Sequence, residues 1–375
     1  MNAPLLLHVY PTFDVGGAQV RFAAIANRFG ARYRHAVVAL DGRSGCLERI
    51  APGVPLHMVD SPVQKGEALP RAMLGIGRLL GRLKPDLLVT SNWGSIEWAL
   101  TRMALPGLPH LHTEDGFGPE ESNGQFKRRM LTRRVALRNS TVIVPSRILL
   151  LAALQAWNLP ARQVHHIPNG LDVSRFAPDG AVAAPGPAGD APVIGTVAAL
   201  RPEKNIARLL RACALLRRDG VPLRLAIMGD GPQREMLEAL AVELGIDAEV
   251  RFAGHMPDPA AAYRGMDLFA LSSDTEQMPF SVLEAMASGL PVASTDAGDV
   301  RYMVAEENAN LVVEQDDAAL AGALRPLLLD APLRARLGAA NRAKALRDYD
   351  QEAMFQAHAA LIDRAIGRVP LPVAA

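Results

Sequence analysis

Short apolar runs alternate with longer amphipathic stretches over most of this chain. In the first half, LLLHVY (5–10) and STVIVPS (140–146) are mainly apolar, whereas residues 18–29 and 71–83 repeat their apolar positions with the period of a helix. Parallel strands that are buried on both faces read as continuous apolar runs, and helical crossovers join them. The alternation therefore predicts an α/β protein with doubly wound parallel sheets.

The alternation stops at Phe176 and resumes near residue 193. Residues 176–191 are rich in Pro, Gly and Ala and lack periodicity, which indicates a linker or an exposed loop. A length of 375 residues suits two domains. We therefore expect two Rossmann-like domains, residues 1–175 and 192–348, with this linker between them. Residues 349–375 are expected to form a C-terminal helix that packs back on the first domain.

The composition favours folded domains without a membrane span. The chain is 49% hydrophobic and 21% charged, so it can bury sizeable cores, and it has no run of eighteen apolar residues. The start, MNAPLLLHVYPTF, lacks the basic region and the cleavage site of a signal peptide, so we interpret it as a first strand. Cys46 and Cys213 fit no metal or redox spacing, which suits a reducing cytoplasm.

The net charge of +1 conceals an asymmetry. Residues 1–171 contain 20 Lys and Arg against 11 Asp and Glu, a balance of +9, so the remainder carries −8. Six of the cations lie in KRRMLTRRVALR, Lys127–Arg138. This stretch is either a solvated helix face or an interfacial helix on anionic lipid at the inner face of the membrane. Its apolar side would consist of Met130, Leu131, Val135 and Leu137. Interleaved aromatic residues are absent, which argues against nucleic acid as a partner.

Open α/β sheets bind ligands at the carboxyl ends of their strands, so the loops that follow strands are the candidate sites. After the first strand, Gly16 and Gly17 precede a helix and form either a tight turn or a close approach to an anion. In the second domain, RPEKN places Arg201 and Lys204 three residues apart at the start of a helix. Two cations and a helix N-terminus suit a diphosphate without a metal, with a solvated turn as the alternative.

Two glutamates, Glu276 and Glu284, are separated by seven residues. The first lies in an expected strand-end loop, and the second lies inside the expected helix FSVLEAMAS (280–288). About two helical turns lie between them, so both can face one side at different depths. Carboxylates would repel a diphosphate, so these two suit the hydroxyls of a sugar and of a ribose. A surface glutamate is the alternative for Glu284, although its neighbours are apolar.

Six segments span nearly the whole chain in a family order: DVGGAQ, IPNGLDVSRF, ALRPEKN, IMGDGPQREMLE, VRFAGHM and EQMPFSVLEAMASGLPV. With them, the sequence resembles the retaining glycosyltransferases of family 4, which have the GT-B fold. The last segment, with its two glutamates and GLPV, is the most specific. The resemblance implies that the C-terminal domain binds a nucleotide-sugar and that the N-terminal domain binds the acceptor.

The resemblance also implies roles for individual residues. Arg201 and Lys204 would hold the donor diphosphate, with no metal or other cofactor. Glu276 would contact the transferred sugar, and Glu284 would bind the ribose. The segment near the sugar and the phosphates would be Gln277, Met278, Pro279 and Phe280. The base would be flanked by Gly254, His255 and Met256, and Gly16 and Gly17 would approach the phosphates from the first domain.

Two positions depart from the family pattern. Gln277 stands where many members have Gly, which affects the expected sugar pocket. In the N-terminal domain many members carry His-Gly, whereas PHLHTEDGFGPEES places Asp115 and Gly116 there. Asp115 is therefore the first candidate for acceptor contact or general base, since a suitably placed carboxylate can act as a base. His112, upstream in the expected strand, is the second candidate, with a core-facing histidine as the alternative.

These observations predict a retaining, metal-independent glycosyltransferase. It would move a hexosyl-type unit from a nucleotide-sugar to a hydroxyl of a saccharide or lipid-linked acceptor, in cell-envelope or exopolysaccharide synthesis. A sugar-nucleotide epimerase of the same fold and a non-catalytic sugar-nucleotide-binding protein are the alternatives. The intact set Arg201, Lys204, Glu276 and Glu284 argues against an inactive protein.

Overall fold

A computed structural model describes residues 3–64, 66–117, 121, 124–256 and 258–368. The chain divides into two compact units. The first consists of Met1–Asn169 with Glu352–Ala375, and the second of Gly170–Gln351. Each unit is built on its own parallel sheet.

The first unit has a seven-stranded sheet in the order β3-β2-β1-β4-β5-β6-β7, with every pairing parallel. Its strands are β1 (Leu5–Tyr10), β2 (Arg34–Ala39), β3 (Leu56–Met58), β4 (Leu87–Ser91), β5 (His110–Thr113), β6 (Thr141–Val144) and β7 (Val164–His166). The strand order reverses direction between β1 and β4. In doubly wound sheets this switch point opens a crevice for ligands.

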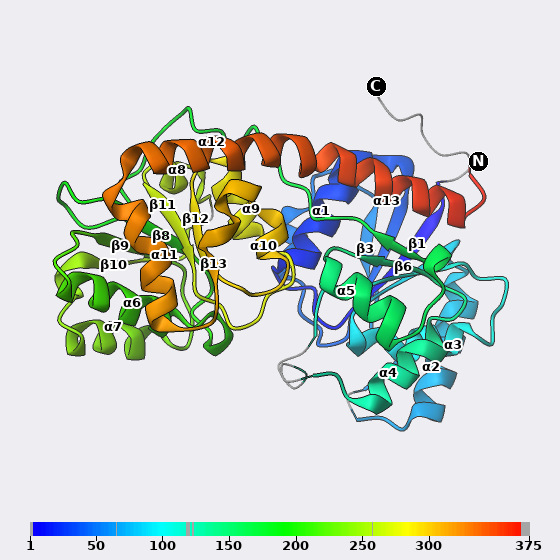
Figure 1. The fold of residues 1–375 in the computed structure, drawn as a ribbon. Coiled ribbons are helices and arrows are strands. Elements are labelled where there is room, and N and C mark those ends of the chain that lie inside the picture. The colour runs from blue at the N-terminus through cyan, green and yellow to red at the C-terminus, as the bar shows by residue number, and fades with distance from the viewer. Residues whose placement is uncertain (1–2, 65, 118–120, 122–123, 257, 369–375) are drawn as a thin grey trace. The chain divides into compact units, whose positions relative to one another are not determined.

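Helices cover both faces of this sheet (Figure 1). They are α1 (Gly17–Phe29), α2 (Leu69–Leu83), α3 (Ile96–Arg102), α4 (Lys127–Ala136), α5 (Arg147–Leu151) and α13 (Gln351–Ala365). Ile76 of α2 and Trp98 of α3 pack in the core of one face, and α4 and α5 extend that layer. Ile25 of α1 and Phe355 of α13 pack in the core of the other face. Residues 369–375 of the expected C-terminal segment lie outside the described residues.

The second unit has a six-stranded sheet in the order β10-β9-β8-β11-β12-β13, again parallel throughout. Its strands are β8 (Val193–Val197), β9 (Arg224–Met228), β10 (Val250–Gly254), β11 (Leu268–Leu271), β12 (Val292–Thr295) and β13 (Val312–Val313). The switch point lies between β8 and β11. The prediction of two doubly wound α/β sheets is therefore confirmed.

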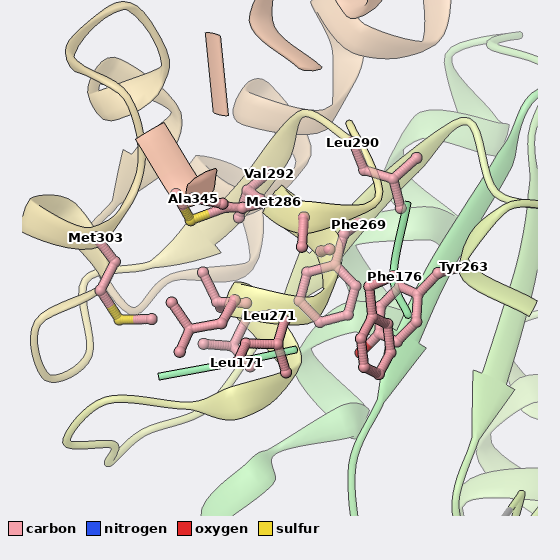
Figure 2. Packing of buried hydrophobic residues seen from close by; sticks show 14 of the residues in the cluster. Leu171, Phe176, Tyr263, Phe269, Leu271, Met286, Leu290, Val292, Met303 and Ala345 are labelled. Carbon is pink, nitrogen blue, oxygen red and sulfur yellow. The ribbon is translucent and has the colours of Figure 1, made fainter. Parts of the chain in front are cut away.

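The second sheet also has a helical layer on each face. Its helices are α6 (Ile206–Arg218), α7 (Arg234–Glu243), α8 (Ala260–Tyr263), α9 (Phe280–Ala287), α10 (Val300–Met303), α11 (Asp317–Leu329) and α12 (Ala331–Asp348). Leu209 of α6 and Leu324 of α11 pack in one core cluster. Tyr263 of α8, Met286 of α9 and Ala345 of α12 belong to the other cluster, which Figure 2 shows around Phe269.

The expected linker, residues 176–191, belongs to the second unit and is mostly exposed. It forms neither helix nor strand, and arginine side chains donate to several of its carbonyl groups. The Arg264 guanidinium donates to the carbonyl oxygens of Ala177 at 2.7 Å and Ala181 at 3.1 Å, and Arg224 donates to that of Pro187 at 3.0 Å. The boundary between the units falls earlier than expected, after Asn169. The Pro- and Gly-rich composition thus correctly indicated an irregular and mostly exposed segment.

Candidate functional site

The switch point of the second unit brings together two of the loops singled out in the sequence. β8 and β11 are neighbours in the sheet, and RPEKN follows the first strand while Glu276 follows the second. The Lys204 Nζ donates to the Glu276 Oε1 at 2.6 Å, and the Ser273 hydroxyl donates to the same oxygen at 2.8 Å. The Glu276 side chain is only 9% exposed. A carboxylate and an ammonium group therefore meet where a doubly wound sheet binds its ligand.

Arg201 lies next to this pair and is differently placed. It precedes the short 3₁₀ turn Pro202–Lys204, and its side chain is exposed. No other residue in the described part of the chain forms a hydrogen bond or an ion pair with its guanidinium group. An unpaired guanidinium at a strand end is suited to two-point binding of a phosphate.

Asn205 caps the helix that follows. It adopts the left-handed conformation at φ 42°, its side-chain oxygen accepts from the backbone N–H of Arg208, and its amide donates to Asp274. Asparagine tolerates this conformation better than most residues and is a favoured N-cap. The amide thereby ties the RPEKN turn to the loop that carries Glu276.

A second tie comes from Arg208, which is buried in the first turns of α6. Its guanidinium donates to the Asp274 carboxylate at 2.6 Å and to the Ser272 carbonyl oxygen at 2.8 Å. The sequence analysis did not identify Arg208 or Asp274. An arginine in an amphipathic helix gives no sign of facing inward, so no sequence signal would have found this pair.

Gly298 fixes the other side of the Glu276 loop. Its φ is +61°, and a Cβ atom there would lie 2.6 Å from the carbonyl oxygens of both Glu276 and Gln277. The next residue, Asp299, donates its backbone N–H to the Gln277 carbonyl oxygen at 2.8 Å. Only glycine combines this conformation with this close approach. The glycine in the strand-end segment TDAGD was the available signal, and the sequence analysis missed it.

Glu284 lies on α9, where the residues on either side of it are fully buried and it is partly exposed. The Tyr263 hydroxyl lies 2.8 Å from its Oε2. Burial raises the pKa of the Glu284 carboxyl, although the hydrogen bond from Tyr263 and the positive charge of Arg175 act to lower it. Glu284 is therefore not an ordinary residue of a solvated helix face.

The remaining second-unit candidates lie along the same strand-end side. Pro279 is the N-cap residue of α9, Met278 is buried, and Phe280 begins the helix. Gly254 ends β10 with φ +75°, His255 after it is exposed and Met256 is half-buried. No hydrogen bond or ion pair joins His255 or Met256 to Glu276 or Glu284 in the described residues.

In the first unit, Asp115 follows β5 and forms an ion pair with Arg21 of α1. Arg21 Nη1 lies 2.6 Å from Asp115 Oδ1, and Arg21 Nη2 donates to Asp115 Oδ2 at 2.9 Å. Arg21 also donates to the side chain of Asn169, and Asn92 accepts the backbone N–H of Asp115. Both carboxylate oxygens are thus engaged, and the side chain is 14% exposed.

His112 lies within β5 and is fully buried. Its Nδ1 is 2.8 Å from the Thr90 hydroxyl, and its Nε2 is 3.4 Å from the Glu114 carboxylate. Both ring nitrogens are therefore engaged in the core. This is the core-facing alternative, so the structure does not present His112 at the strand end beside Asp115.

Both units match known families of glycosyltransferase domains. Residues 16–170 match the family "Glycosyl transferase 4-like domain", and residues 182–344 match "Glycosyl transferases group 1". A GDP-mannose-dependent alpha-mannosyltransferase of Mycolicibacterium smegmatis is 31% identical over 318 residues, 80% of each chain. The chain belongs to the group 1 glycosyltransferases.

Two further likenesses extend this assignment. A lipopolysaccharide core biosynthesis glycosyltransferase, LpsE, of Rhizobium meliloti is 32% identical over 46% of this chain and 50% of its own length. The crystal structure of Anabaena Alr3699/HepE in complex with UDP and glucose has a TM-score of 0.77, with 18% identity, over 96% of this chain and 100% of that chain. The glycosyltransferase thus has the GT-B fold that the sequence predicted.

Helix α4 of this glycosyltransferase differs in part from the expected cationic surface. Arg133 is fully buried, and its Nε donates to the Glu114 carboxylate at 3.0 Å. Its guanidinium carbon lies 5.0 to 5.5 Å from the ring centroids of Trp93, Phe117 and Trp157. Arg129 also faces inward and pairs with Glu121 at 3.0 Å.

The outer face of α4 retains four of the six cations: Lys127, Arg128, Arg134 and, just beyond the helix, Arg138. Leu131 and Val135 lie among them and are 62% and 44% exposed. The expectation that Leu137 belongs to this apolar side is wrong, because Leu137 is fully buried. Met130 is half-buried, so the exposed apolar side is narrower than the sequence suggested.

Neither a metal cluster nor a membrane-spanning helix is found in the part of this glycosyltransferase that the structure describes. No described residues form a group of three or more His, Cys, Asp or Glu side chains that could hold a metal ion. Among the described helices, none combines the length and the apolar character needed to cross a bilayer.

Gly16 and Gly17 occupy the start of α1 in the glycosyltransferase. Gly16 is the N-cap residue in an extended conformation, and Gly17 is exposed in the first turn. α1 has thirteen residues and carries no acidic residue in its first turn. Among the second-unit residues that the sequence singled out, a hydrogen bond joins Lys204 to Glu276, and Glu284 bonds separately to Tyr263. Gly16, Gly17 and Asp115 lie in the first unit.

Proposed function

We propose that this chain is a retaining glycosyltransferase that uses a nucleotide-sugar donor and a hydroxyl of a saccharide or lipid-linked acceptor. The observation that carries the proposal is the switch point of the second unit, where the unpaired Arg201 lies beside the Lys204–Glu276 pair. An anionic group fits the Arg201 guanidinium, and a polyhydroxyl group fits the Glu276 carboxylate.

The donor diphosphate is bound by Arg201 and Lys204. Both lie at the strand end before α6, and charge on the departing diphosphate is stabilised by preorganised cations at such a position. No metal is required for this role, because the two cations supply the positive charge. Lys204 shares its ammonium group between the diphosphate and Glu276, whose Oε1 lies 2.6 Å from the Lys204 Nζ.

The sugar and the ribose are bound by the two glutamates. Glu276, held by Ser273 and by the backbone around Gly298, accepts hydrogen bonds from the transferred sugar. Glu284 accepts them from the ribose. The segment Gln277–Phe280 follows Glu276 directly and lies along the sugar and phosphates, and Gly254–Met256 lies beside the base.

The acceptor is bound by the first unit, with Asp115 as a contact residue. Because Arg21 engages both oxygens of Asp115, we propose hydrogen bonding to an acceptor hydroxyl rather than proton abstraction as its role. His112 has no part in this proposal, since it is buried in the core. Gly16 and Gly17, at the N-terminus of α1, are proposed to approach the donor phosphates.

The names of the relatives support this choice of substrates. One relative is GDP-mannose-dependent, one acts in lipopolysaccharide core biosynthesis, and the Anabaena structure contains UDP and glucose. A role in cell-envelope or exopolysaccharide synthesis is consistent with them. The sugar, the base and the acceptor of this chain are to be identified by experiment.

The outer face of α4 is proposed to bind an anionic membrane surface, at the cytoplasmic side. Cations near such a surface contribute about 1 kcal/mol each. Arg128→Gln with Arg134→Gln should therefore weaken binding to phosphatidylglycerol vesicles by roughly tenfold or more. Arg218→Gln, an exposed arginine of α6, is the control. Equal binding by the double variant and the wild type would remove this face from the proposal.

The test of the proposed function is a donor panel. The purified chain is incubated with UDP-, GDP- and ADP-sugars, and nucleotide release and thermal shift are measured. One nucleotide-sugar should raise the melting temperature and release its nucleoside diphosphate, and proton NMR of the transfer product should show the anomeric configuration of the donor. A product with inverted configuration would contradict the retaining mechanism, and no response to any nucleotide-sugar would contradict the function.

A further inference from the structure

Tyr263 provides a buried hydroxyl beside Glu284. It ends the short helix α8 and is fully buried. Its hydroxyl oxygen lies 2.8 Å from Glu284 Oε2 and 3.2 Å from the Ser281 carbonyl oxygen. A tyrosine hydroxyl has one proton to donate, and the charged, nearer carboxylate is the stronger acceptor. The phenol therefore donates to Glu284.

The phenol ring cannot shift freely. Phe176 meets it edge-on with centroids 5.8 Å apart, and Phe269 lies beside it, tilted by 38°, with centroids 5.9 Å apart. Figure 2 shows the three rings at one end of the buried cluster. Close-packed interiors resist such displacements, so the hydroxyl is a fixed donor.

The other oxygen of Glu284 is in a different situation. No described residue donates to Oε1, and the side chain is partly exposed while Leu283 and Ala285 beside it are fully buried. A glutamate side chain has several rotatable bonds. The hydrogen bond from Tyr263 to Oε2 therefore limits the positions that Oε1 can adopt. Less conformational entropy of the side chain is then lost when a ligand binds.

We propose that Tyr263 is a positioning residue for the nucleotide: it holds Glu284 by Oε2 so that Oε1 receives a ribose hydroxyl, and the pair selects ribonucleotides over deoxyribonucleotides. The inference deepens the proposed function and rests on the ribose role of Glu284. A site built to bind a hydroxyl rejects a ligand that lacks it, because its own polar groups are then left unpaired.

The test is a double-mutant cycle read by calorimetry. UDP and GDP, with their 2′-deoxy and 3′-deoxy forms, are titrated into the wild type, Tyr263→Phe, Glu284→Ala and the double variant. Tyr263→Phe should bind the ribonucleotide about tenfold more weakly, consistent with loss of a hydrogen bond to a charged group. The double variant should bind no more weakly than Glu284→Ala, and the preference for ribose over one deoxy form should shrink in Tyr263→Phe.

Two further variants accompany the cycle. Tyr349→Phe removes a hydroxyl from the same buried cluster, where it donates to the Met303 carbonyl oxygen, and should leave nucleotide affinity unchanged. Glu284→Asp leaves the core intact but shortens the side chain away from Tyr263. Because the shorter side chain also withdraws its oxygens from the ligand, weaker ribonucleotide binding by this variant tests the ribose role of Glu284 and not the role of Tyr263.

The outcomes separate this inference from the proposed function. Normal affinity in Glu284→Ala would remove the ribose role itself. Weak binding by Glu284→Ala together with wild-type affinity and ribose preference in Tyr263→Phe would overturn only the inference. Additive losses in the double variant would also overturn it, because Tyr263 would then act through packing and not through Glu284.

Discussion

The strand ends of the two units both carry charged side chains, but the charges are balanced differently. In the first unit, Arg21 pairs with Asp115, Arg133 with Glu114 and Arg129 with Glu121. In the second unit, Lys204 pairs with Glu276 and Arg208 with Asp274, but Arg201 has no partner among the described residues.

This difference indicates which kind of ligand each edge can accept. An edge whose ions are paired with one another gains little from a charged ligand, because binding it would break existing pairs. Such an edge suits a neutral saccharide with many hydroxyls. An edge with an unpaired guanidinium gains a charge-assisted contact from a diphosphate. The comparison therefore supports the proposal that the second unit binds the anionic donor and the first unit binds the acceptor.

The largest effect is expected from breaking the buried pairing in the first unit. Arg133→Met would leave the fully buried Glu114 without its cation, and loss of one partner of a buried pair costs about 3–5 kcal/mol. Thermal unfolding should show a large drop in the melting temperature of the first unit. Arg134→Met, its exposed neighbour on the same helix, should change stability by less than about 0.5 kcal/mol. Similar melting temperatures for the two variants would mean that the buried ion pairs at the strand ends of the first unit do not stabilise it.

The next effect concerns the pair in the second unit. Glu276→Ala should lower kcat by about a hundredfold, the scale of losing one electrostatic contact to the reacting group. It should not weaken binding of free UDP or GDP, since it frees Lys204 for the diphosphate. Steady-state kinetics and calorimetry on one preparation decide this. Weaker nucleotide binding with unchanged kcat would reverse the roles given to the two glutamates.

Removal of the unpaired cation should have a somewhat smaller effect. Arg201→Ala is expected to lower turnover at least tenfold, which is about 1.4 kcal/mol of barrier. Arg218→Ala removes an exposed arginine from the same unit and should be neutral. Initial rates with the donor that the panel identifies provide the measurement. If both variants turn over like the wild type, Arg201 is a solvated turn residue.

A pH titration of nucleotide affinity tests the proposed role of Glu284. Burial raises the pKa of its carboxyl above the ordinary 4.5, so the neutral form persists to a higher pH than in a free side chain. The carboxylate accepts ribose hydroxyls, so nucleotide affinity should fall as the pH drops through this raised pKa. Glu284→Ala corrects for titration of the nucleotide phosphates and should lack this part of the profile. Identical profiles for the two proteins would contradict the ribose role.

The smallest expected effect is that of chelation. Because Arg201 and Lys204 are proposed to balance the diphosphate, treatment with EDTA should leave the initial rate unchanged. Loss of activity that manganese or magnesium restores would show that a metal, not these cations, carries the charge.

The sequence predicted the strand-end loops of the second unit well. The alternation of strands and helices put Arg201, Lys204 and Glu276 in strand-end loops, and the carboxyl ends of neighbouring parallel strands lie on one side of a sheet. Lys204 and Glu276 therefore meet although they are 72 residues apart.

The sequence predicted less well where a charged or polar side chain is buried although residues of its type are usually exposed. Arg133 and Arg208 belong to basic helices, and nothing in their spacing separates them from exposed neighbours such as Arg134. Tyr263 and Glu284 come from two different helices, 21 residues apart in the sequence, and only their packing in the core brings the hydroxyl within 2.8 Å of the carboxylate.

The most direct test of the division between the two edges is hydrogen exchange measured by mass spectrometry, with and without UDP or GDP. Backbone amides that a nucleotide covers or orders exchange more slowly. The account predicts protection in peptides that span residues 199–206 and 272–286 of the second unit. Peptides that span β5 and α4, residues 110–117 and 124–138, should exchange at the same rate in both states. Protection confined to the first-unit peptides would contradict the assignment of the donor to the second unit.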